Sequence, residues 1–163
     1  MATRRSAAHT NLKVKLMKTY FLHSLLFFIL TFSNSSLAAE LIINLSNQEK
    51  AGTALLAIYN SAEAFEGSVK QEKRSEVGVF KGAEQYIEPQ DTSQLSFKIP
   101  DGEYAIALFI DTNNNKKLDK NFLGIPKEQY GFSNNAMGTL SAPTFKQAKF
   151  NLIGKTIQNI KLK

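Results

Sequence analysis

The chain has 163 residues, with 20 Lys and Arg, 14 Asp and Glu, and no cysteine or tryptophan. The lack of cysteine excludes disulfides, cysteine nucleophiles and iron–sulfur clusters. The two histidines, His9 and His23, both lie before residue 38, so the rest of the chain cannot form a Ser-His-Asp triad or a His-ligated zinc site.

Residues 1–38 are predicted to be a secretory signal peptide. Lys18 provides the charged flank, residues 21–32 the apolar stretch, and residues 36–38 a small-x-small cleavage site. About twelve apolar residues are too few to span a bilayer, which needs roughly twenty. An uncleaved anchor and a buried helix are the alternatives. The basic segment before the apolar stretch is either an extended n-region or a mis-assigned start, with Met17 as the first residue.

Cleavage after residue 38 changes the charge of the protein. Residues 39–163 keep fifteen Lys and Arg against fourteen Asp and Glu, a formal charge of +1, so the pI of about 9.5 belongs largely to the leader. This remainder has no run of more than two basic residues, and we therefore expect no nucleic-acid partner. We expect a periplasmic or secreted protein with one domain, residues 39–163, and no stable membrane span after cleavage.

Residues 39–163 are predicted to form an all-β antiparallel sandwich of about seven strands. Short apolar and β-branched runs alternate there with Gly, Asn, Asp and Pro clusters, which is the pattern of strands and turns. The all-apolar run 104–110 indicates a central strand covered on both faces. The segment 62–76 is predicted to contain a short helix around residues 62–65. The predicted strands are residues 41–46, 53–59, 77–80, 94–99, 103–110, 149–153 and 156–162.

Two connections have the chemistry of tight turns. Pro100-Asp101-Gly102 combines a fixed φ with a residue that tolerates positive φ, and predicts a hairpin between the strands on either side. Gly154-Lys155 predicts a second two-residue turn, which would join the last two strands.

A polar loop follows the central strand and has the spacing of a calcium-loop half-site. Oxygen-bearing side chains recur there at every second position, and alternate residues of such loops point toward one centre. The predicted calcium ligands are the side chains of Asp111, Asn113, Asn115 and Asp119 and the backbone carbonyl of Lys117.

The same loop departs from an EF-hand at two positions. The sixth position is Lys116 instead of glycine, and the twelfth is Phe122 instead of a bidentate acid, for which Glu128 is a candidate replacement. The alternative interpretation is an Asn- and Asp-rich turn whose side chains bond their own backbone.

Residues 100–106, 111–119 and 121–135 resemble the bacterial family known as domain of unknown function 2141. The run Gly-Ile-Pro-x-Glu-x-Tyr-Gly-Phe-Ser-Asn, from Gly124 to Asn134, is its most specific signature here. The resemblance implies an exported β-sandwich of an immunoglobulin- or transthyretin-like kind, and no agreed activity. The family usually has Asn-Gly-Asn at residues 113–115 and often a glycine at position 116.

The segment after the calcium-type loop is a candidate ligand surface. Two aromatic rings would form a stacking platform beside hydrogen-bonding side chains, and sugars or peptides would suit it. The alternative is that the rings cover the open end of the sandwich. The surface consists of Glu128, Tyr130, Phe132, Ser133, Asn134 and Asn135.

These features favour a non-catalytic module of the cell envelope or surface, whose calcium-stabilised loop orders the aromatic segment. The expected partner is an unknown envelope or extracellular protein or a glycan. The alternative is a small carbohydrate-active or carbohydrate-binding protein that uses a pair of the acids Asp101, Asp111, Asp119 and Glu128.

Overall fold

The computed structural model describes residues 38–70, 78–139 and 141–163, and residues 37–163 form one compact unit. The predicted signal-peptide helix lies outside the described residues. Within those residues, no helix has the length and apolar character that crossing a membrane requires.

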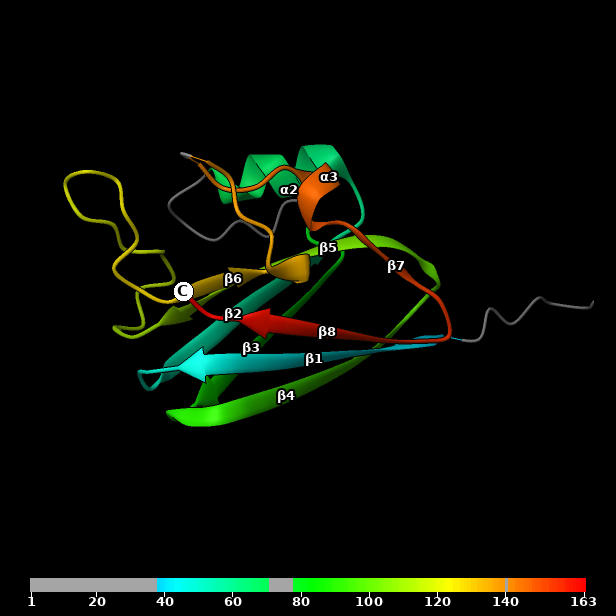
Figure 1. The fold of residues 1–163 in the computed structure, drawn as a ribbon, viewed down its shortest axis with the longest axis horizontal. Helices are drawn as coiled ribbons and strands as arrows, with labels where there is room; N and C mark the ends of the chain where they lie inside the picture. Colours follow the sequence, from blue (N-terminus) through cyan, green and yellow to red (C-terminus); the bar gives the residue numbers. More distant parts are fainter. Residues whose placement is uncertain (1–37, 71–77, 140) are drawn as a thin grey trace, which may run out of the picture. The chain divides into compact units, whose positions relative to one another are not determined.

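In the part of the chain that the structure describes, eight strands form two sheets, which confirms a mostly β fold (Figure 1). The three-stranded sheet has the order β4-β1-β8, and the other has the order β3-β2-β5-β6, with β7 also paired to β5. The strands are β1 (Ala39–Gln48), β2 (Gly52–Tyr59), β3 (Lys81–Ile87), β4 (Gln90–Ile99), β5 (Gly102–Asp111), β6 (Tyr130–Phe132), β7 (Phe150–Leu152) and β8 (Lys155–Lys161).

The prediction of purely antiparallel pairing is wrong at one place, because β8 runs parallel to β1. The other strand pairs are antiparallel. The chain enters β8 from β7, which belongs to the other sheet, so no hairpin forces β8 to run against β1.

The main core lies between the two sheets. Along β1 every second side chain is buried, as Leu41, Ile43 and Leu45 show, while the residues between them are partly exposed. The other sheet contributes Ile106 and Ile110 of β5 to the same cluster. This alternation matches a sheet with one face toward the core.

A second, smaller core covers the other face of β2 and β5. The helices α2 (Ala62–Val69) and α3 (Phe145–Ala148) pack there, and the small residues Ala57 and Ala105 let them approach the sheet. Phe65 of α2 is fully buried in this core. The strand β5 is therefore covered on both faces at Ala105, whereas Ala107 and Phe109 on the second face are only partly buried.

The hairpin predicted at residues 100–102 is wrong, because this tight turn crosses from one sheet to the other. β4 ends at Ile99 in the first sheet, and β5 begins at Gly102 in the second. β7 and β8 are likewise in different sheets, and the turn between them contains Gly154 at a φ of 56°. The alternation of apolar residues shows which face of a strand is buried. It does not show whether the next strand pairs beside that strand in the same sheet or packs across the core in the other sheet.

Two strands were not predicted from the sequence, and one predicted strand is misplaced. Residue 77 lies outside the described residues, and residues 78–80 form a turn and bend before β3 begins. β3 is a mostly exposed edge strand, so it lacks the apolar pattern that marks a strand. β6 has only three residues. The predicted helix around residues 62–65 exists and is longer, since it extends to Val69.

Candidate functional site

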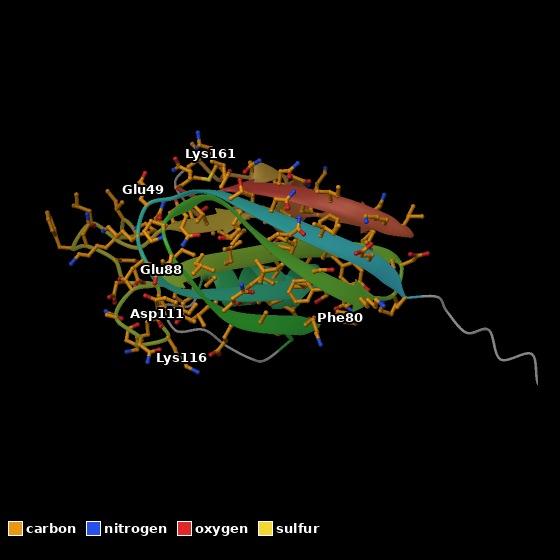
Figure 2. The ribbon with its side chains drawn as sticks, turned by 90° about the horizontal axis from the view of Figure 1, so that it is seen from below. Glu49, Phe80, Glu88, Asp111, Lys116 and Lys161 are labelled. Atoms are coloured by element: carbon orange, nitrogen blue, oxygen red, sulfur yellow. The ribbon has the colours of Figure 1, made fainter. Side chains whose placement is uncertain are left out.

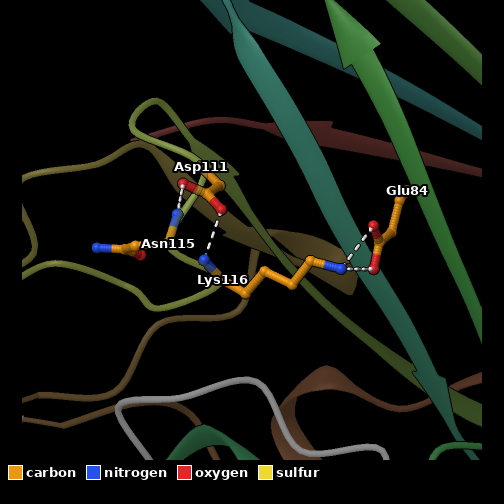
Figure 3. Close-up of polar contacts among 4 residues, drawn as sticks. All are labelled: Glu84, Asp111, Asn115 and Lys116. Atoms are coloured by element: carbon orange, nitrogen blue, oxygen red, sulfur yellow. Dashed lines mark hydrogen bonds and ion pairs between the residues drawn. The ribbon is translucent and has the colours of Figure 1, made fainter.

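The predicted calcium loop begins at Asp111, the last residue of β5. Figure 2 places Asp111 and Lys116 at the same end of the unit as Glu49 and Glu88. The Asp111 side chain is only 2% exposed. Its Oδ1 accepts a hydrogen bond from the backbone N–H of Asn115 (3.2 Å) and its Oδ2 one from Lys116 (2.8 Å), as Figure 3 shows. The loop is therefore folded back over this carboxylate.

The amide side chains of the loop connect to its second acid. The Nδ2 atoms of Asn113 and Asn115 donate to the two carboxylate oxygens of Asp119, at 2.7 and 3.1 Å. The Oδ1 of Asn115 accepts from the backbone N–H of Lys117 at 2.8 Å. The four predicted ligand side chains, from Asp111 to Asp119, thus belong to one hydrogen-bonded network.

Lys116 occupies the sixth position of the loop in a left-handed conformation, with a φ of 58°. Glycine adopts this conformation most easily, so the backbone has the geometry of a loop with glycine at this position. The Nζ of Lys116 lies 3.3 Å from both carboxylate oxygens of Glu84 on β3 (Figure 3). Its positive charge is therefore paired with an acid other than Asp111.

Glu128 binds the two ends of the loop. Its carboxylate is 6% exposed and accepts from the backbone N–H of Thr112 (2.8 Å), the Thr112 hydroxyl (3.1 Å) and the backbone N–H of Asp119 (3.1 Å). Glu128 therefore holds both ends of the loop together. Sequence spacing offered it as a replacement acid; its hydrogen bonds show how a residue so far along the chain reaches the loop.

The donor set is not a cluster of acids. Within the described ranges, no group of three or more His, Cys, Asp or Glu side chains is close enough to hold a metal ion. A cation at this loop would depend on the carboxylates of Asp111 and Asp119 together with amide and carbonyl oxygens.

Of the predicted ligand-surface residues, Ser133 is buried, whereas Asn134 and Asn135 are exposed but hydrogen-bonded to neighbouring elements. Ser133 is fully buried, and its Oγ accepts from the Ile106 N–H (2.9 Å) and donates to the Ala148 carbonyl (2.6 Å). Asn134 donates to the same carbonyl at 3.1 Å, and Asn135 accepts a 2.7 Å bond from a backbone N–H of β8. These contacts hold the short 3-10 helix η1 (Ser133–Asn135) against α3 and β8.

Tyr130 and Phe132 line a cleft of about 750 Å³. Its walls are the end of α2, the segment 118–126 and residues 137–139 and 141–144. The two rings are in edge contact with their centroids 5.9 Å apart. The lining of the cleft mixes apolar side chains with polar and charged ones such as Glu66, Lys70 and Lys120. The sequence indicated the two rings, but not that α2 would supply the facing wall.

Residues 42–161 match the model of a family described as "Uncharacterized protein conserved in bacteria (DUF2141)". The chain belongs to this family. The resemblance noted in the sequence is thereby confirmed. The part of this DUF2141 protein that matches includes the 111–119 loop, Glu128 and every wall of the cleft. No curated protein and no solved structure matches the chain.

Proposed function

We propose that this DUF2141 protein is an exported, non-catalytic module of the cell envelope or surface, in which calcium bound by the 111–119 loop orders one wall of the cleft. The proposal rests on the network that joins the loop's alternate oxygen-bearing side chains. Carboxylate and amide oxygens are the ligands that calcium prefers. An immunoglobulin- or transthyretin-like topology and export by a signal peptide are part of this proposal.

The residues of the loop fit a calcium ion in charge and in ligand type. Each oxygen of Asp111 accepts one N–H, which leaves further lone-pair capacity for a cation. Two carboxylates balance the charge of the ion, and Lys116 is already paired with Glu84. Asn113 and Asn115 point their amide nitrogens at Asp119, so calcium binding requires these amides to turn their oxygens inward.

The loop and the cleft are connected through backbone hydrogen bonds. The N–H of Lys127 donates to the carbonyl of Asp119 at 2.7 Å. The side chain of Glu128 accepts from the backbone N–H of Asp119. Residues 120–126, which lie between these contacts, contribute to a cleft wall. Fixing Asp119 therefore fixes both ends of that wall. The ligand remains as predicted from the sequence: a segment of an envelope or extracellular protein, or a glycan.

Binding fits the geometry better than catalysis by the same acids. Hydrolysis of a glycan requires two carboxyl groups that face the substrate. Asp111 and Glu128 are buried, and their oxygens accept hydrogen bonds from the backbone. The alternative of a carbohydrate-active enzyme stays a prediction, and none of these contacts favours it.

The test is the melting temperature of residues 39–163 in EDTA, in magnesium and in about 10 mM calcium. If the dissociation constant is about 0.1–1 mM, calcium adds about 1.4–2.7 kcal/mol of stability. That is a rise of about 5–10 °C for a domain of this size. Asp119→Asn should abolish the rise, whereas Glu63→Gln, at an exposed acid of α2, should keep it. Equal melting in all three solutions would reduce the loop to a structural turn.

A further inference from the structure

Residues 119–127 form a small hairpin, which we call the finger. Lys120 and Pro126 form a β-bridge at its base. The N–H of Asn121 donates to the Ile125 carbonyl at 2.8 Å. The Asn121 Oδ1 accepts from the N–H groups of Leu123 (2.9 Å) and Ile125 (3.0 Å). The tip therefore has a defined turn, and Figure 1 shows this yellow segment extending away from the sheets.

The tip of the finger exposes large apolar side chains. Phe122 is 95% exposed, Leu123 67% and Ile125 55%. The described part of the chain has eight exposed large hydrophobic side chains, and three of them lie within residues 122–125. Isolated apolar residues are common on protein surfaces, but a contiguous group is typical of an interaction site.

Lysines surround this apolar tip. Lys120 and Lys127 flank the base of the finger, and Lys117 precedes it; among the residues that the structure describes, none of the three forms an ion pair. The acid at the base, Asp119, already accepts hydrogen bonds from two asparagine amides. The other acids of the loop, Asp111 and Glu128, are buried. Residues 111–128 hold four lysines and three acids, but two of the acids are buried, so the charges exposed around the tip are mostly positive.

We propose that the finger docks on an anionic lipid surface, with Phe122 and Leu123 inserted at the boundary between headgroups and acyl chains. An apolar tip with a cationic base is complementary to such a surface, since lysines near anionic headgroups add attraction while apolar side chains partition below them. A stable protein interface needs about 800 Å² per partner, more than three side chains provide. The proposal goes beyond the calcium module and does not require calcium.

The chain lacks tryptophan, so one substitution supplies a unique fluorescent probe. Phe122→Trp in residues 39–163 should shift its emission to the blue with phosphatidylglycerol vesicles in EDTA, and brominated lipid should quench it. Phosphatidylcholine vesicles should give little change. The matched control is Tyr86→Trp at an exposed aromatic of β3, whose emission should not shift.

Sedimentation with the same vesicles measures the affinity. Phe122→Ser should weaken binding about tenfold or more, because one large apolar side chain no longer inserts. Lys120→Gln with Lys127→Gln, and an increase from about 0.05 M to about 0.5 M salt, should each weaken it as well. Ile153→Ser, at a 71% exposed residue of the β7–β8 turn, should leave it unchanged.

Two results would overturn the proposal. One is that the unmodified protein does not sediment with phosphatidylglycerol vesicles. The other is that Phe122→Ser and Ile153→Ser have equal effects on sedimentation. Self-association of the free protein that is lost in Phe122→Ser, together with no binding to vesicles, would assign the finger to a second copy of the chain instead.

Discussion

Glu128 should be the residue on which the 111–119 loop depends most. It accepts three hydrogen bonds, two from Thr112 and one from the backbone of Asp119, and it is buried. Glu128→Ala removes the acceptor from all three donors. Glu128→Gln keeps one carbonyl oxygen but places an amide N–H where the second oxygen was.

The expected loss follows from these contacts. A hydrogen bond to a charged group contributes about 1.5–3 kcal/mol. The donors here are only partly buried, so in the variants water can bind these N–H groups and recover part of the lost free energy. We expect Glu128→Ala to lower the free energy of unfolding by about 2–4 kcal/mol, and Glu128→Gln by about 1–2 kcal/mol. With about 4 °C per kcal/mol for a domain of this size, the melting temperature should fall by about 8–16 °C in Glu128→Ala and by about 4–8 °C in Glu128→Gln.

Thermal melting followed by circular dichroism measures the global loss, and amide hydrogen exchange locates it. The N–H groups of Thr112 and Asp119 should both exchange faster in Glu128→Ala, because both lose their acceptor, whereas Glu128→Gln keeps one oxygen and should expose only one of them. Glu63→Ala serves as the control for removing an exposed acid and should stay within about 0.5 kcal/mol of the unmodified protein. If Glu128→Ala melts within about 2 °C of the unmodified protein and both amides stay protected, Glu128 does not hold the two ends of the loop together.

Three further variants test other parts of the fold. Gly131→Ala would place a Cβ 2.6 Å from Cγ2 of Ile160, so it should cost about 1–3 kcal/mol in a denaturant titration. Burial, and then the charge of Asp101, raise the pKa of Tyr104 above its ordinary value of 10.0. The stability this represents is complete below about pH 10 and is lost as pH rises through the raised pKa, so Tyr104→Phe should flatten the decline in melting temperature at high pH. Lys116→Gly should be more stable than Lys116→Ala by about 0.5–1 kcal/mol. Both variants lose the ion pair with Glu84, but only alanine is strained in the left-handed conformation of this position. Equal stability of the two variants would show that the loop changes conformation.

The spacing of the polar loop predicted more of its local geometry than of its surroundings. Asp111, Asn113, Asn115 and Asp119 meet in one network because a turn of this length brings alternate residues together. Glu128 reaches the loop only because the finger, residues 119–127, folds into a hairpin and brings its two ends side by side. Sequence separation alone gave no way to place that carboxylate between two particular N–H groups.

The cleft and the order of strands could not be predicted for a related reason. Burial depends on which face of a strand is apolar, and that pattern identified β1, β2, β4 and β5. It contains no information about which sheet receives the next strand, so the turn at residues 100–102 was predicted to close a hairpin. The cleft joins α2 to segments more than 45 residues later in the chain, and these meet only when the second core forms.

Three consecutive residues before and within β6 connect the separate parts of the proposed site. Glu128 holds the 111–119 loop. Gln129 donates to the Asn47 carbonyl (2.8 Å) and accepts from the Glu49 N–H (2.8 Å), which attaches the same segment to the end of β1. Tyr130 lines the cleft and exchanges backbone hydrogen bonds with Lys163. Glu128 is thus bonded to the 111–119 loop, Gln129 is bonded to the end of β1, and Tyr130 lines the cleft. The segment that follows the finger is therefore already held by the first sheet. A cation that fixed the loop would act mainly on the finger, which is the cleft wall between the loop and this segment. Calcium should therefore order the finger more than the rest of the cleft, and its largest effect on hydrogen exchange should fall in residues 119–127.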